Sequence, residues 1–188
     1  MKWSLANKVA VVTGSAGGLG HALARELHRR GCHLALLDID YQGLVVLKDA
    51  LETGEQKITI HPTDVACEED VLSARVEILA LHGRVDILIN NAGISISRAF
   101  GRMPLPDYKR LFDVNFWGAV YCTRHFLPEL QQQPDSHLVN IVSDFALMGF
   151  PGKTAYASSK AAVTGFTKVI KTELAGTGVQ VSLVIPPP

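Results

Sequence analysis

Short stretches that are apolar at almost every position alternate along this chain with longer stretches of helical periodicity. The apolar stretches are Lys8–Thr13, His33–Asp38, Lys57–His61, Val85–Asn90, His137–Ser143 and Val179–Ile185. The helical stretches begin with the run through Leu19, Leu23 and Leu27 and continue in Gln42–Leu51, Glu68–His82, Pro106–Gln131 and Thr154–Ala175. Strands without polar alternation are covered on both faces, and strands separated by helices run parallel. The pattern therefore predicts a parallel sheet with helices on both sides.

Right-handed crossovers between such strands build a doubly wound α/β sheet of the Rossmann type. The chain has 188 residues, of which 47% are hydrophobic. That length is enough for one packed domain and would crowd a second. We therefore expect residues 1–188 to form a single domain, since no repeat, low-complexity tract or linker divides them.

The charges and cysteines exclude several classes of protein. Lys and Arg number 18, as do Asp and Glu, so the formal net charge is zero and gives no attraction to nucleic acid or to an anionic membrane. No apolar run approaches the roughly 20 residues that span a bilayer, and Asn7 and Lys8 interrupt any signal-peptide-like stretch. Cys32, Cys67 and Cys122 are spaced neither as a disulfide framework nor as a zinc site. We predict a cytoplasmic protein without a metal, a membrane contact or a nucleic-acid partner.

A glycine-rich segment, Thr13–Gly20, joins the first strand to the first helix. Glycines allow the backbone to approach a pyrophosphate, and a helix N-terminus supplies free N–H groups and a positive dipole end. Asp38 follows 18 residues after Gly20, at the end of the second strand, where a carboxylate can bind both hydroxyls of the adenosine ribose and repel a 2′-phosphate. No Lys or Arg lies within Thr13–Gly20. These features favour NAD; the alternatives are an ordinary tight turn and a solvated turn Asp.

Tyr156 and Lys160 lie four residues apart on a predicted helix and therefore share one face. A phenol with a pKa of about 10 is a poor base at neutral pH, and a nearby ammonium favours the phenolate. On its own the YxxxK spacing is common, so an exposed Tyr–Lys pair is the alternative.

Five motifs now occur in order: the TGxxxGxG loop, Asn90–Gly93, Asn115, Ser143 and the YxxxK pair. Together they resemble the classical short-chain dehydrogenase/reductase family, over about Leu5–Ile185. The resemblance implies that Tyr156 is the general acid/base and that Lys160 holds the nicotinamide ribose and lowers the tyrosine pKa. It also implies that Ser143 binds the substrate oxygen and that Asn115 interrupts a helix and holds a water in a proton relay.

The resemblance further implies a cofactor site and an adenine-contacting pair, Asp64 and Val65. The implied cofactor-binding residues are Gly14, Ser15, Gly18, Leu19, Gly20, Asp38, Asp64, Val65, Asn91, Ala92, Gly93, Tyr156, Lys160 and Pro186. The sequence departs from the family at its end, where the family has a Pro-Gly turn and then a Thr. Here Pro187 and Pro188 follow Pro186, so we expect that the C-terminal, substrate-covering segment is missing. A truncated chain, a partly observed chain and a short natural variant all fit.

The leading expectation for function is an NAD-dependent alcohol dehydrogenase or ketone reductase that acts on a non-polar secondary alcohol or carbonyl. Candidate pocket residues, which could equally belong to the core or to an interface, are Ile94, Ile96, Phe145, Met148 and Phe150. A catalytically silent NAD-binding subunit or redox sensor is the main alternative. A sugar-nucleotide epimerase or dehydratase of related fold is a third reading, disfavoured because such enzymes need a larger substrate domain.

Two helices carry more apolar residues than one face needs. The first carries Leu111, Phe112, Phe116, Trp117, Val120 and Tyr121, and the second carries Ala157, Ala161, Val163, Phe166, Val169 and Ile170. The resemblance implies that these helices pair across a two-fold axis, so we expect a homodimer or homotetramer. The alternative is that both helices pack only on their own sheet.

Overall fold

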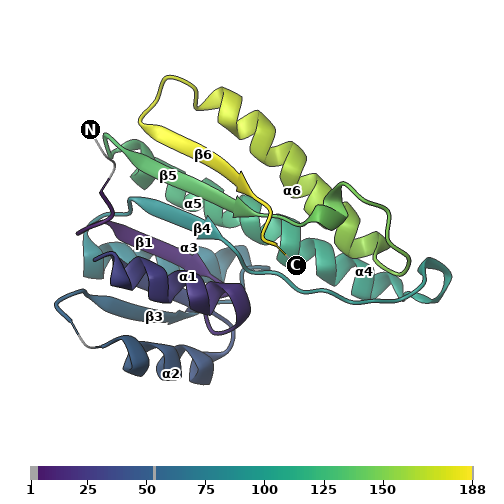
Figure 1. Ribbon diagram of the computed structural model, residues 1–188, viewed down its shortest axis with the longest axis horizontal. Coiled ribbons are helices and arrows are strands. Elements are labelled where there is room, and N and C mark those ends of the chain that lie inside the picture. The colour runs from purple at the N-terminus through teal and green to yellow at the C-terminus, as the bar shows by residue number, and fades with distance from the viewer. Residues whose placement is uncertain (1–3, 53, 188) are drawn as a thin grey trace.

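The computed structural model describes residues 4–52 and 54–187, which form a parallel sheet of six strands in the order β3-β2-β1-β4-β5-β6 (Figure 1). The strands are β1 (Val9–Thr13), β2 (His33–Asp38), β3 (Ile58–Pro62), β4 (Ile87–Asn90), β5 (Ser136–Ile141) and β6 (Val179–Val184). All six predicted strands are present, with ends that differ by at most two residues. The strand order reverses between β1 and β4, which confirms the doubly wound fold.

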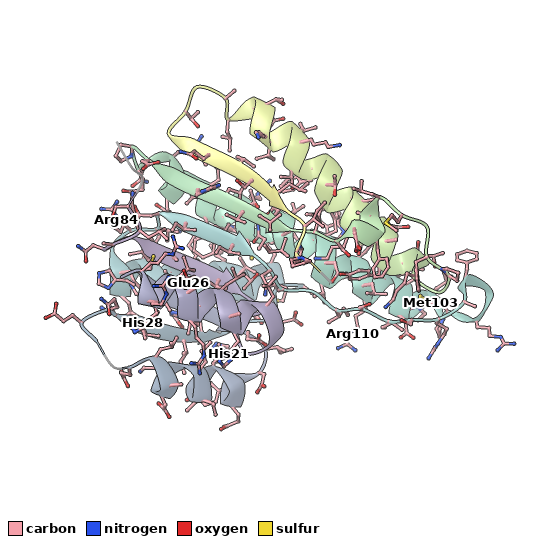
Figure 2. All side chains as sticks on the ribbon, viewed as in Figure 1. His21, Glu26, His28, Arg84, Met103 and Arg110 are labelled. Atoms are coloured by element: carbon pink, nitrogen blue, oxygen red, sulfur yellow. The ribbon has the colours of Figure 1, made fainter. Side chains whose placement is uncertain are left out.

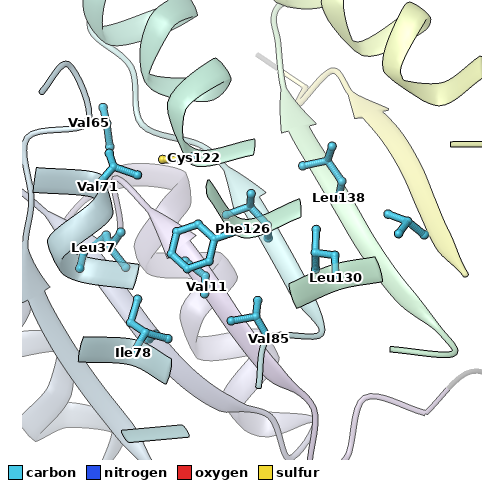
Figure 3. Close-up of a cluster of buried hydrophobic side chains, with 14 of the residues drawn as sticks. Val11, Leu37, Val65, Val71, Ile78, Val85, Cys122, Phe126, Leu130 and Leu138 are labelled. Atoms are coloured by element: carbon cyan, nitrogen blue, oxygen red, sulfur yellow. The ribbon is translucent and has the colours of Figure 1, made fainter. Parts of the chain in front are cut away.

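Helices cover the sheet from both sides (Figure 1). Helices α1 (Gly18–Arg29) and α2 (Tyr41–Leu51) pack on one face through a cluster that contains Leu27, Leu36 and Leu47. Helices α3 (Glu68–His82), α5 (Gly118–Gln131) and the end of α6 (Thr154–Glu173) pack on the other face. Figure 3 shows this second cluster, in which the fully buried Phe126 ring lies among side chains of the strands and of α3. The central strands β1, β2 and β4 are thereby buried on both faces.

The helix predicted at Pro106–Gln131 is interrupted. Helix α4 (Leu105–Phe112) is followed by a π-helical turn, Asp113–Trp117, before α5 begins. A π turn makes i→i+5 hydrogen bonds and is frequent at functional sites. The interruption at Asn115 that the resemblance implied is therefore confirmed.

Two 3₁₀ turns complete the elements, at Phe100–Arg102 and Asp144–Ala146. The second follows β5, which ends at Ile141, two residues before the end of the predicted strand His137–Ser143. Ser143 caps this turn, because its hydroxyl accepts a hydrogen bond from Phe145 N–H at 3.3 Å.

On the face that carries α1 and α2, no described helix lies in front of β5 and β6 (Figure 1). Gln180 and Val184 of β6 are accordingly exposed. Met1–Trp3 and Pro188 lie outside the described residues. Part of what the sequence predicts about the two ends of the chain depends on them. Among the helices that are described, none is long and apolar enough to cross a membrane.

Candidate active site

A cavity of about 640 Å³ lies at the carboxyl ends of β1, β2, β3 and β4. Its lining comprises Gly14, Ala16, Gly17, Gly18, Leu19, Asp38, Ile39, Asp40, Thr63, Asp64, Val65, Ala66, Asn91, Ala92, Gly93, Ile94, Arg110, Asp113 and Val114. This is the crevice at the point of strand-order reversal where doubly wound sheets bind their ligands. We refer to it below as the dinucleotide cleft.

The glycine-rich loop gives this cleft a backbone wall without side chains. Gly14 and Gly18 have φ angles of +64° and +52°, which a residue with a Cβ adopts only with strain. A Cβ on Gly14 would lie 2.7 Å from Ala92 Cα, whereas a Cβ on Gly17 or Gly18 would meet nothing within 4 Å. The loop is thus packed on its inner side and open on its outer side, where α1 begins. That shape fits a pyrophosphate bound to the N–H groups of a helix N-terminus.

Two residues of the loop face inward rather than toward the cleft. Ser15 is buried, and both its N–H and its hydroxyl donate to the Leu37 carbonyl at 3.2 Å. A Cβ on Gly20 would lie 1.9 Å from the Gly14 carbonyl oxygen. Both residues hold the loop against its neighbours, and their direct contact with a cofactor stays a prediction.

Asp38 lines the cleft in a fixed orientation. One carboxylate oxygen accepts a hydrogen bond from Ala16 N–H at 2.9 Å, and the other accepts from Asp40 N–H at 3.0 Å. Asp40 itself caps α2 by accepting from Gly43 N–H at 3.0 Å. Asp38 is therefore held by the glycine-rich loop, and its contact with a ribose stays a prediction.

The segments after β3 and β4 form the remaining predicted walls. Asp64 and Val65 both line the cleft, and Asp64 accepts from Ala66 N–H at 2.9 Å. The Asn91 amide donates to the carbonyls of Thr13 and Gly14, each at 3.0 Å, while Thr13 Oγ1 accepts from the N–H of Asn91 and of Ala92. These bonds join the loop after β4 to the glycine-rich loop.

Asn115 lies inside the π turn and is 2% exposed. Its Oδ1 accepts from Ile94 N–H at 2.8 Å, and its Nδ2 donates to the Ile94 carbonyl and to Ser159 Oγ, both at 3.0 Å. One side chain thus connects the loop after β4 with α6. The two hydrogen bonds to Ile94 are contacts that the sequence analysis did not foresee.

Lys160 is buried next to the same loop. Its ammonium donates to the Ile141 carbonyl at 3.0 Å, and burial lowers its pKa to about 8. A Cβ on Gly93 would lie 3.2 Å from Asn115 Oδ1 and 3.3 Å from Lys160 Nζ. The structure therefore brings Gly93, Asn115 and Lys160 together at one end of the dinucleotide cleft.

Tyr156 is half-buried, one helical turn before Lys160. Its ring packs edge-on against Phe145, with centroids 6.1 Å apart, and the Lys153 ammonium lies 5.7 Å from its centroid. Among the candidate pocket residues, Ile94 and Ile96 pack against the same small buried cluster as Tyr156. Met148 and Phe150 are instead 60% and 56% exposed.

Ser143 and Pro186 lie outside the lining of the dinucleotide cleft. The Ser143 hydroxyl donates to Asp144 Oδ1 at 3.0 Å and lines a second cavity, of about 320 Å³, with Leu183 and Ile185. Pro186 lines neither cavity. Sequence reasoning also missed Arg110 and Val114, which line the cleft from α4 and the π turn; their i, i+4 spacing just before Asn115 was an available signal.

Known proteins resemble this chain along almost its whole length. SadH of Mycobacterium tuberculosis, which carries an oxidoreductase name, is 38% identical over 171 residues, or 91% of this chain and 62% of SadH. The 3-oxoacyl-(acyl-carrier-protein) reductase FabG of Thermotoga maritima is 32% identical over 182 residues, which cover 97% of this chain and 74% of FabG. The crystal structure of a short chain dehydrogenase/reductase from Burkholderia phymatum in complex with NAD superimposes with a TM-score of 0.94 at 31% identity.

That superposition covers 98% of this chain and 66% of the Burkholderia chain, so this chain is shorter than the proteins it resembles. A sequence model of the short chain dehydrogenase family matches residues 8–188. The match includes the glycine-rich loop, the π turn and the Tyr156–Lys160 pair. The chain belongs to the short chain dehydrogenase family.

Proposed function

We propose that this chain is an NAD-dependent oxidoreductase that interconverts a non-polar secondary alcohol and its ketone. The observation that carries the proposal is the meeting of Gly93, Asn115 and Lys160 at one end of the dinucleotide cleft. Tyr156 stands on the same helix as Lys160, one turn away. Proton-coupled hydride transfer needs a proton donor or acceptor, a positive charge beside it and a site for the dinucleotide. The phenol of Tyr156, the ammonium of Lys160 and the cleft would supply these.

The residues of this chain divide the work as follows. Tyr156 exchanges the proton of the substrate hydroxyl, and Ser143 orients the substrate oxygen by a hydrogen bond. Lys160, which is mostly charged at neutral pH because its pKa is about 8, holds the ribose next to the nicotinamide. Asn115 keeps Ile94 and α6 in register around these groups. NAD, when bound, supplies the hydride acceptor.

Two further features support the choice of cofactor and substrate. Three acidic side chains, Asp38, Asp40 and Asp64, line the cleft near the end of β2 and β3, and they would repel a 2′-phosphate. Tyr156, Ile94 and Ile96 pack on one small apolar cluster, which would favour an apolar substrate there. The crystal structure of the Burkholderia relative is a complex with NAD, in keeping with this choice.

A catalytically silent NAD-binding subunit is the second candidate. Met148 and Phe150, close to Tyr156 in sequence, are more than half exposed. Hydride transfer generally requires a site from which water is excluded, so this exposure favours a chain that binds NAD without turnover.

One assay separates the two candidates. The chain is incubated with NAD or NADP and a panel of secondary alcohols, and the absorbance of the reduced cofactor is followed. Turnover with NAD, lost by at least about a hundredfold in Tyr156→Phe while NAD affinity changes by no more than a few-fold, supports the enzyme. NAD binding without turnover in any alcohol supports the silent subunit, and tighter binding of NADP than NAD contradicts the role given to Asp38.

We also propose that the chain assembles as a homodimer or homotetramer. Leu111 and Val163, two of the residues expected at an interface, are buried inside the chain instead. The aromatic residues beside them form a continuous surface: Phe116 packs edge-on against Phe166, and Trp117 stacks on Tyr121 at 5.8 Å. Trp117 is 44% exposed, so this surface offers apolar area to a second copy.

A cytoplasmic location is proposed on the state of the thiols. Cys32, Cys67 and Cys122 are all free, as is usual in a reducing compartment. Fractionation of the cells that make the protein would test this.

A further inference from the structure

The charges that line the dinucleotide cleft are unbalanced. Four of the charged lining side chains are carboxylates, those of Asp38, Asp40, Asp64 and Asp113, and the only cation in the described lining is Arg110. A dinucleotide brings two negative phosphate groups into this space. The acidic side chains repel these phosphates, so the groups that favour them are the N–H groups of the glycine-rich loop and the single cation.

Arg110 is free to bind an anion. It lies on α4, one turn before Val114, and its side chain is exposed and points away from the helix (Figure 2). Within the described part of the chain, its guanidinium has no hydrogen bond or ion pair. Asp113, which is three residues further along, does not pair with it, and Asp107, three residues earlier, pairs with Arg98 at 3.4 Å.

The chemistry of the two walls is complementary. The glycine-rich loop supplies backbone N–H groups near Gly17 and Gly18, and α4 borders the same cavity with a guanidinium. The planar fork of Arg donates two parallel hydrogen bonds to a phosphate, which Lys cannot do. Because Asp38 already repels a phosphate on the adenosine ribose, the pyrophosphate is the anion that remains for Arg110.

We propose that Arg110 binds the pyrophosphate of the dinucleotide from α4, opposite the N–H groups of the glycine-rich loop. The assignment rests on the proposed function of the cleft as an NAD site. It makes α4 part of cofactor binding, in addition to the loops at the strand ends.

The test measures dissociation constants by calorimetry at low salt for NAD, ADP, adenosine and NADP. The variants are Arg110→Gln and, as the matched control on the same helix, Lys109→Gln, whose exposed side chain does not line the cleft. We expect Arg110→Gln to raise the dissociation constants of NAD and ADP by roughly tenfold, as for the loss of a hydrogen-bonded ion pair. Adenosine binding should change by less than about twofold, and Lys109→Gln should bind all four ligands like the unaltered chain.

Three outcomes would overturn the assignment. ADP bound equally by Arg110→Gln and the unaltered chain would show that Arg110 does not contact the pyrophosphate. An equal loss of affinity for adenosine and for ADP would show a change in the shape of α4. Weaker binding of NADP with unchanged binding of ADP would place Arg110 on the 2′-phosphate. If the unaltered chain binds none of the four ligands, the proposed function fails and the assignment of Arg110 fails with it, which is distinguishable from the other three results.

Discussion

At the scale of single residues, burial of the charged Lys160 ammonium destabilises the folded chain, and other contacts must offset that loss of free energy. The residue is 4% exposed, and its ammonium donates a hydrogen bond to the Ile141 carbonyl. Burial lowers its pKa from 10.5 to about 8, which corresponds to roughly 3 kcal/mol of free energy against the charged form. A cation held so unfavourably is consistent with a functional role for its charge.

This cost predicts a pH dependence of stability. Between pH 8 and 10.5 the unfolded chain binds a proton at Lys160 that the folded chain has released, so the free energy of unfolding rises with pH in this window. We expect Lys160→Met to lack this rise, which should reach about 2–3 kcal/mol in the unaltered chain. Urea unfolding at pH 7.5 and pH 10 gives the change in the free energy of unfolding for each protein. The difference between the two changes isolates Lys160, because the other titrating groups contribute equally to both proteins. The exposed Lys168→Met is the control; an identical pH dependence in Lys160→Met and the unaltered chain would contradict the assignment.

At the scale of elements, the π turn connects α4 and α5 and is hydrogen-bonded to the loop after β4 and to α6. It directs the Asn115 side chain inward, where it pairs with both backbone groups of Ile94 and with Ser159 of α6. A regular helix through Asp113–Trp117 would rotate the following residues by part of a turn and break these contacts. The turn therefore fixes the loop after β4, which includes Gly93, relative to the Tyr156–Lys160 helix.

Removing these contacts should destabilise the chain in a recognisable place. Asn115→Leu leaves the half-buried N–H and carbonyl of Ile94 without their Asn115 partner, and we expect a loss of about 2–4 kcal/mol in the free energy of unfolding. Hydrogen exchange should accelerate at the Ile94 amide and leave the amides of β1 unchanged. Asn115→Asp, which keeps the acceptor for Ile94 N–H, should retain more protection there than Asn115→Leu. Equal protection of the Ile94 amide in Asn115→Leu and the unaltered chain would show that the side chain does not hold the loop.

At the scale of the whole molecule, the sheet is covered unevenly and an aromatic surface runs across α5 and α6. Trp117, at the end of the π turn, stacks on Tyr121, and Val169 of α6 is 56% exposed. Obligate interfaces usually bury more than about 2,000 Å² in total and are apolar at their centre. This surface is the one that we assign to assembly.

The assembly proposal predicts a change in mass. The unaltered chain should sediment as a dimer or tetramer, and the double variant Trp117→Lys with Val169→Lys should sediment near the single-chain mass of 20.4 kDa, because two charges would have to be buried. Val46→Lys, a change at a 65% exposed position of α2, is the control and should sediment like the unaltered chain. A single species at 20.4 kDa for the unaltered chain would contradict the proposal.

The sequence by itself determined the elements and their motifs. The strands and helices followed from periodicity within short windows, since apolar spacing and backbone sterics are local properties. The glycines of the Thr13–Gly20 loop were recognisable for the same reason, and Asp38 was predicted from its place at the end of a strand. The family resemblance added Asn115, Ser143 and the Tyr156–Lys160 pair, which periodicity could not distinguish from ordinary surface residues.

The tertiary structure alone decided which of these residues meet. Asn115 pairs with Ile94, 21 residues earlier, and Lys160 with Ile141, 19 residues earlier, because the strand order and the packing of α6 bring these segments together. The tertiary structure also directs the Ser15 side chain to the Leu37 carbonyl and brings Arg110 into the lining of the cleft. Such contacts depend on crossovers and helix packing across many residues, so no short window of sequence contains them.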